Sequence, residues 1–194
     1  MKHIKIILNI LFAIIILVQH SVSQNQITAE STQRDCIVVE FGFGLSSVDE
    51  ELIVGAAYET DQFIYALRLS SQTEFDMFDS YSPDNRNILL DAIIGVRESV
   101  WLLQLSAATG FSYIQQTTRG QFIKSGGGLF TDGGPSLYES IQRSNLGIPF
   151  HGSIAFSKPL FGIIQGVIAC HASISILRPI WGITFTTRWY ILKL

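Results

Sequence analysis

Charged residues are scarce in this sequence. Lys, Arg, Asp and Glu make up 15% of the 194 residues, whereas hydrophobic residues make up 47%. Soluble domains usually carry about a quarter charged residues, so this composition is unusual for a domain that meets only water. The formal net charge of −3 argues against nucleic acid as a partner.

Long hydrophobic runs are also lacking, with one exception near the start. Lys2 and Lys5 precede a largely apolar run of thirteen residues over 6–18, which is too short to span a bilayer as a helix. Small Ser21 and Ser23 follow, as a signal peptidase requires. The pattern predicts a signal peptide over 1–23 and a polar lead-in over 24–35; a non-cleaved anchor helix is the alternative.

Cysteine is nearly absent, and no motif for a metal or a cofactor is present. A disulfide between Cys36 and Cys170 is conceivable in an oxidising compartment, but strand parity places them on opposite faces, which favours two small apolar fillers. No residues have zinc-site spacing. The glycine-rich stretch at 124–136 lacks the Gly-Lys-Ser/Thr ending of a phosphate loop, so we expect a flexible loop. The sequence thus predicts no cofactor and no metal.

Extended runs, by contrast, fill most of the chain. They are separated by Gly, Pro, Asn and Asp, and the second, fourth and sixth connections are short. The long third and fifth connections, 73–86 and 118–145, share one end of an up-and-down meander. Over residues 36–194 we therefore expect an all-β fold, an eight-stranded antiparallel up-and-down transmembrane β-barrel. The expected strands are 37–46, 51–59, 62–73, 87–98, 100–117, 146–156, 160–176 and 180–192.

The two faces of these runs differ sharply in chemistry. In WGITFTTRW (181–189), Trp181, Ile183, Phe185 and Trp189 alternate with small or polar residues. One parity is apolar and uncharged in every run, which indicates a lipid-facing wall. The other parity is rich in Gly and Ser and carries the charges, and we interpret it as a narrow lumen that a charge network plugs, in preference to a proton or ion path. The expected network is Glu40, Glu59, Arg68, Asp91, Arg97 and Arg188, with His151 and His171 on the same face.

Aromatic residues lie near the ends of the expected strands. Such placement is typical of the girdles that flank the apolar band of a membrane barrel. The expected girdle residues are Tyr58, Trp101, Tyr113, Trp181 and Trp189.

The segments GIPFHGSIAFSKPLFGIIQGV (147–167) and WGITFTTRWYILKL (181–194) complete the pattern. With them, the chain resembles small eight-stranded outer-membrane β-barrel proteins of Gram-negative bacteria, the outer membrane protein beta-barrel domain family. The resemblance implies an outer-membrane location, contact with outer-membrane lipid and with the barrel-assembly machinery, and a structural or surface-interaction role through loops 73–86 and 118–145. Such barrels often end on an aromatic residue; here Trp189 and Tyr190 precede Leu194.

Two other functions are open. A doubled His-x-Ser, at His151–Ser153 and His171–Ser173, resembles the pair of outer-membrane lipid A deacylases. It implies a lipid-modifying hydrolase using His171 and Ser173, although no Asp or Glu follows Glu139 to orient the histidine. A secreted lipocalin-like carrier with the faces inverted also fits the strand count. It would need a charged exterior and an early Gly-x-Trp, and both are missing.

Overall fold

The computed structural model describes residues 35–75, 81–124, 135–160, 163–176 and 179–193. These belong to one compact unit, Arg34–Leu194. The expected signal peptide, and all of the lead-in except Asp35, lie outside the described residues and stay predictions. Within the described part of the chain, no helix is long and apolar enough to cross a membrane. The described strands are β1 (Cys36–Ser46), β2 (Glu50–Glu59), β3 (Phe63–Thr73), β4 (Tyr81–Ser82), β5 (Arg86–Val100), β6 (Leu103–Lys124), β7 (Ser136–Phe156), β8 (Ile164–Ser175) and β9 (Ile180–Lys193).

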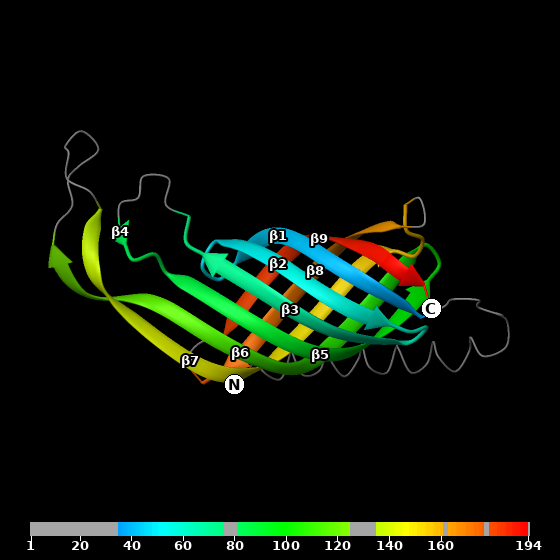
Figure 1. The fold of residues 1–194 in the computed structure, drawn as a ribbon, viewed down its shortest axis with the longest axis horizontal. Helices are drawn as coiled ribbons and strands as arrows, with labels where there is room; N and C mark the ends of the chain where they lie inside the picture. Colours follow the sequence, from blue (N-terminus) through cyan, green and yellow to red (C-terminus); the bar gives the residue numbers. More distant parts are fainter. Residues whose placement is uncertain (1–34, 76–80, 125–134, 161–162, 177–178, 194) are drawn as a thin grey trace, which may run out of the picture. The chain divides into compact units, whose positions relative to one another are not determined.

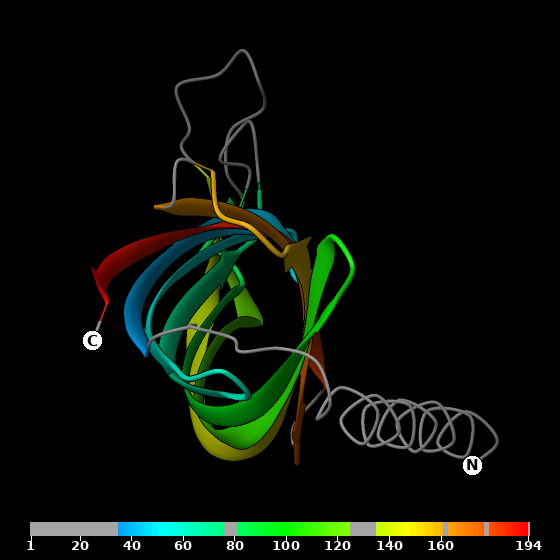
Figure 2. The same ribbon diagram turned by 90° about the vertical axis from the view of Figure 1, so that its right-hand side faces the viewer.

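Eight of these strands close into a ring, as Figures 1 and 2 show. Each strand pairs antiparallel with its neighbour in the order β1-β2-β3-β5-β6-β7-β8-β9, and β9 pairs back onto β1. The short β4 lies outside the ring and pairs parallel with the start of β7. The predicted fold class, an eight-stranded antiparallel up-and-down barrel, is confirmed.

The two longest connections, 74–85 and 125–135, lie at the same end of the barrel, as the sequence predicts. We call one end the loop end: it carries connections 47–49, 74–85, 125–135 and 176–179. We call the other the turn end: it carries 60–62, 101–102 and 157–163. The last of these is longer than the predicted turn at 157–159, because β8 begins at Ile164 and not at residue 160.

The fifth connection differs most from the expectation of a loop over 118–145. β6 and β7 have 22 and 21 residues and continue as a paired hairpin, from Ser112↔Gly147 out to Lys124↔Leu137. This hairpin extends beyond the barrel wall at the left of Figure 1. Polar residues at 115–119 and 142–145 fit a strand pair that meets water on both faces, and they lack the apolar alternation on which the sequence prediction depended.

Alternation of burial follows every strand of the wall. Side chains such as Phe43, Leu67 and Phe185 are 69%, 60% and 60% exposed, while their sequence neighbours are buried or half-buried. Buried apolar residues occupy parts of the interior in three groups, around Val38, around Leu89 and around Val167. The apolar face is therefore outside, and this overturns the carrier alternative, which needs the faces inverted.

Candidate functional site

The interior of the barrel is the candidate site, and Arg68 lies near its centre. From β3, Arg68 donates from Nε and Nη2 to the two carboxylate oxygens of Glu40 on β1, at 2.7 and 3.1 Å. Its Nη1 lies 3.1 Å from Nδ1 of His151 on β7. Because a guanidinium can only donate, His151 accepts at Nδ1 and carries its proton on Nε2. His151 is therefore neutral in this arrangement.

Asp91 on β5 completes this side of the interior. His151 donates from Nε2 to Oδ2 of Asp91 at 3.1 Å, and Ser112 Oγ donates to Oδ1 of the same carboxylate. Asp91 is 3% exposed, so both of its oxygens have partners in a place where water is scarce. The pair holds β5 and β7 together across the lumen.

Arg188 on β9 extends the network in the other direction. Its Nε donates to Glu40 Oε1 at 2.7 Å, and its Nη1 lies 3.6 Å from Oε1 of Glu59 on β2. Arg97 on β5 donates to the other oxygen of Glu59. One connected path therefore runs through the barrel, and its members are Asp91, His151, Arg68, Glu40, Arg188, Glu59 and Arg97.

The structure thus brings together all six charged residues of the sequence-predicted network. Every one of them is buried, with Arg188 and Glu59 at 1% and 0% exposure. Removing one partner of a buried ion pair costs about 3–5 kcal/mol, because the other charge is left without compensation. The interior is consequently held in one arrangement by charged residues from five strands and by His151 from a sixth.

A second polar row lies toward the loop end, and sequence reasoning missed it. Asn87 donates to Gln72 at 3.1 Å, and Gln72 donates to Glu51 Oε1 at 3.1 Å. Glu51 is 1% exposed and follows the same parity as Gly55 and Glu59 on β2. Parity alone would have found it, since odd-numbered positions of this strand point inward.

The two His-x-Ser pairs also face the interior. Ser153 Oγ shares a 2.6 Å hydrogen bond with Ser106, and both ring nitrogens of His151 are occupied by Arg68 and Asp91. Ser173 Oγ and the ring nitrogens of His171 have no hydrogen-bond partner among the described residues, so the two are not bonded to each other. A nucleophile and its base need that bond, and hydrolysis is not the chemistry that this arrangement supports best.

An acid nevertheless lies beside His171. No acid follows Glu139 in the sequence, yet Glu51 on β2 lies 3.1 Å from His171 on β8. The ring closes β2 and β8 toward each other, with only β1 and β9 between them, so distance along the chain says little about distance across the lumen.

The predicted girdle residues all lie on the outer face or at the barrel ends. Tyr58, Tyr113, Trp181 and Trp189 are 37%, 46%, 52% and 43% exposed. Trp101 lies in the 101–102 turn with a positive φ of 56° and is 87% exposed, so it does not begin a strand as expected. Cys36 is buried and Cys170 exposed, on opposite faces of the wall.

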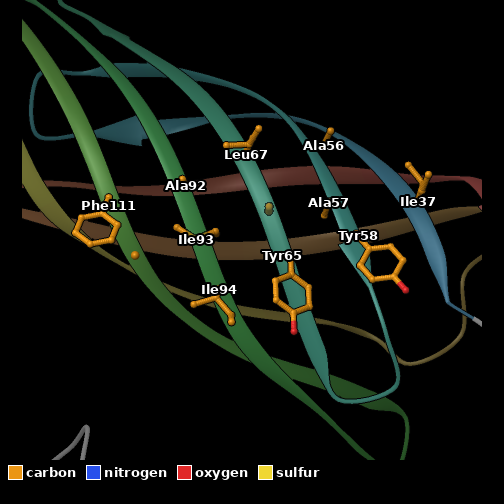
Figure 3. A pocket seen from close by; sticks show the side chains of 12 residues that line it. Ile37, Ala56, Ala57, Tyr58, Tyr65, Leu67, Ala92, Ile93, Ile94 and Phe111 are labelled. Atoms are coloured by element: carbon orange, nitrogen blue, oxygen red, sulfur yellow. The ribbon is translucent and has the colours of Figure 1, made fainter.

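A shallow apolar hollow interrupts the outer face (Figure 3). Small Ala56, Ala92 and Gly110 lie among larger side chains such as Tyr58 and Phe111, which leaves a depression over β1, β2, β3, β5 and β6. Its lining residues are apolar or aromatic, and none of them belongs to the charged network.

Outside the barrel, Arg119 joins the β6–β7 hairpin to the 74–85 connection. Its guanidinium donates to both carboxylate oxygens of Glu74, at 3.3 and 2.6 Å, and to Pro83 O at 3.0 Å. It also stacks 4.8 Å from the centre of the Tyr81 ring, which contacts Tyr138 on β7 edge to face. In the described part of the loop end, the hairpin and the 74–85 connection therefore form one connected surface and not independent loops.

No family model matches the chain, and no curated protein matches its sequence. Solved structures do match. The N-terminal β-barrel domain of Pseudomonas aeruginosa OprF has a TM-score of 0.56 at 10% identity, over 81% of this chain and 98% of that one. Neisserial surface protein A has a TM-score of 0.53 at 7% identity, over 81% and 96%. The chain therefore shares the fold of small eight-stranded outer-membrane β-barrels.

Proposed function

We propose that the chain is an outer-membrane β-barrel protein whose barrel is a closed scaffold and whose loop end binds a partner outside the cell. The observation that carries the proposal is the connected charge network, which ties six strands together through the lumen. Such an interior favours rigidity over transport. The fold likeness supports the membrane location.

The outer face supports insertion into lipid. Large apolar side chains cover it, and closure of the ring leaves no strand of the wall with an unpaired edge in hydrocarbon. Outer-membrane barrels place short turns toward the periplasm and longer loops outside. By the same rule, the turn end faces the periplasm and the loop end faces outward.

The role of the loop end follows from its construction. The β6–β7 hairpin extends beyond the wall, and Arg119 fixes the 74–85 connection against it. A surface that is ordered before binding loses less conformational freedom on association. We infer that this end is the part of the molecule that meets a ligand or another cell-surface molecule.

Conductance in a planar bilayer tests the closed lumen. The wild-type barrel should show no steady open current, because Arg68, Arg188 and their carboxylates occupy the interior. Replacing Glu40 and Arg188 together by alanine removes a matched pair of charges and should produce a measurable current. Steady conductance of the wild type would contradict the closed scaffold and favour an ion path.

A further inference from the structure

The hollow on the outer face of the barrel lies toward the turn end. Across the strands, Ala56 pairs with Leu67 and Leu67 pairs with Ala92, so two small side chains flank one large one in the same outward row. Tyr58 and Tyr65, in the next row toward the turn end, form one edge of the hollow, with ring centroids 6.2 Å apart. The volume of about 630 Å³ lies within the ~300–1,000 Å³ of sites that hold small ligands.

An apolar depression in this wall requires an apolar occupant. A void would leave the atoms that line it without dispersion partners, and water gains nothing from an apolar surface. Acyl chains surround the outer face of a membrane barrel, and they are flexible enough to follow a depression. A chain in the hollow touches protein on more sides than a chain on a smooth wall, so the hollow favours one retained chain.

The edge of the hollow nearest the turn end is polar. Figure 3 shows that the hydroxyls of Tyr58 and Tyr65 point away from Ala56 and Ala92. The Tyr58 hydroxyl donates to Oδ2 of Asp35 at 2.5 Å in an exposed position. Tyrosines at the ends of membrane-spanning elements place their hydroxyls at the level of the lipid headgroups. An apolar body with one polar edge matches the division of a phospholipid into chain and headgroup.

Charges beside this edge are mainly acidic. The charged residues in 35–38, 57–66 and 93–102, which form the turn end of β1, β2, β3 and β5, are Asp35, Glu59, Asp61, Arg97 and Glu98. Glu59 and Arg97 pair with each other in the lumen. Three acids are left at the rim, and their carboxylates attract a cationic headgroup and repel a lipid of net negative charge.

The same charges argue against a second copy of the chain as the occupant. Two copies in one membrane, related by a two-fold axis along the membrane normal, present the same patch to each other. Contact through the hollow would bring the turn-end acids of both copies together, and juxtaposed like charges oppose association.

We propose that the hollow holds an acyl chain of one phospholipid whose headgroup carries a primary ammonium group, with this ammonium beside Asp35. A primary ammonium donates charge-assisted hydrogen bonds to a carboxylate. By the orientation proposed above, the lipid belongs to the periplasmic leaflet. The site goes beyond the closed lumen and the loop-end partner, and its test depends on neither.

Native mass spectrometry of the full chain tests the site. The barrel is folded in vesicles that contain equal amounts of phosphatidylethanolamine and phosphatidylglycerol with the same acyl chains, and is then extracted in a mild detergent. The wild type should retain one phosphatidylethanolamine, and at least about tenfold less phosphatidylglycerol, which corresponds to about 1.4 kcal/mol of preference.

Variants separate the chain from the headgroup. Ala56→Leu combined with Ala92→Leu fills the hollow and should lower the retained phosphatidylethanolamine at least about tenfold, while these exposed apolar positions let the barrel fold in lipid. Ala107→Leu is the matched control, since Ala107 is exposed on the same face outside the hollow, and retention should not change.

Removing the acids tests the headgroup. Asp35→Asn, Asp61→Asn and Glu98→Gln together should abolish the preference for phosphatidylethanolamine over phosphatidylglycerol, because the charge that selects the ammonium is gone. Any one of four results would overturn the proposal: no retained lipid on the wild type, equal retention of the two lipids by the wild type, full retention by the double leucine variant, or a dimer of the chain in place of the lipid complex.

Discussion

Arg188 touches two carboxylates that belong to different strands. It donates to Glu40 on β1 and lies against Glu59 on β2, and only 1% of its surface is exposed. Arg188→Leu should lower the free energy of unfolding by about 3–5 kcal/mol, because two buried acids lose a cation. Denaturant unfolding of the barrel in lipid vesicles measures this loss.

A double-mutant cycle tests whether this loss of stability comes from the Glu40–Arg188 pair. Glu40→Gln should reduce the cost of Arg188→Leu, since the two changes remove both partners of one bond. Asp91→Asn serves as the control, because Asp91 bonds His151 and Ser112 and does not contact Arg188. Equal coupling with both acids would argue against direct pairing.

Phe185 lies close to Arg188 in the sequence, but its side chain is on the outer face of the barrel. It lies near the middle of β9 and is 60% exposed on the apolar face. Phe185→Arg should cost about 2–4 kcal/mol in lipid vesicles, because the charge lies near the bilayer midplane. Ile191→Arg, on the same face near the strand end, should cost about 0–1 kcal/mol. Similar costs at both positions would contradict a lipid-facing wall.

At the residue scale, parity was the useful signal in the sequence. Glu40 and Arg68 could be assigned to the interior because both of their sequence neighbours are apolar, and Arg188 because its parity is opposite to that of Phe185 and Trp189. Which acid meets which base could not be predicted. That depends on strand tilt and register around the ring, and no local pattern encodes the approach of Glu51 to His171.

Among the elements, the β6–β7 hairpin is joined to the 74–85 connection by the side chain of Arg119. Arg119→Ala removes the bonds to Glu74 and Pro83 and the contact with Tyr81. The 74–85 connection should then open more often, and limited proteolysis within it should become several-fold faster. Arg143→Ala is the matched control, since Arg143 is exposed on the same hairpin. An unchanged cleavage rate would mean that Arg119 does not hold the connection.

The sequence predicted the strands of the barrel wall, but it did not predict that β6 and β7 continue beyond the wall as a paired hairpin. Strands such as 51–59 were found because lipid imposes apolar alternation along one face. The distal parts of β6 and β7 face water on both sides, so Thr118 to Asn145 carries no alternation and was predicted as a loop. Their pairing depends on cross-strand contacts such as Phe122 with Tyr138.

For the whole molecule, the expected orientation has a direct test. Protease added to intact cells should cleave within 125–135, because the loop end is expected to face outward. The 101–102 turn should be cut only after the outer membrane is opened. Cleavage of 101–102 in intact cells, with 125–135 protected, would mean that the barrel is inserted the other way.

The pairing of β1 with β9 has a consequence for the order of assembly. The seam joins Glu40 to Arg188, two residues separated by most of the barrel sequence, so the ring cannot close before the last strand has been synthesised. Contacts between such distant segments form slowly. Sliding β9 by one residue would turn Arg188 toward hydrocarbon and Trp189 inward. The Glu40–Arg188 bond therefore forms only in the correctly closed ring, and it stabilises that register relative to a ring shifted by one residue.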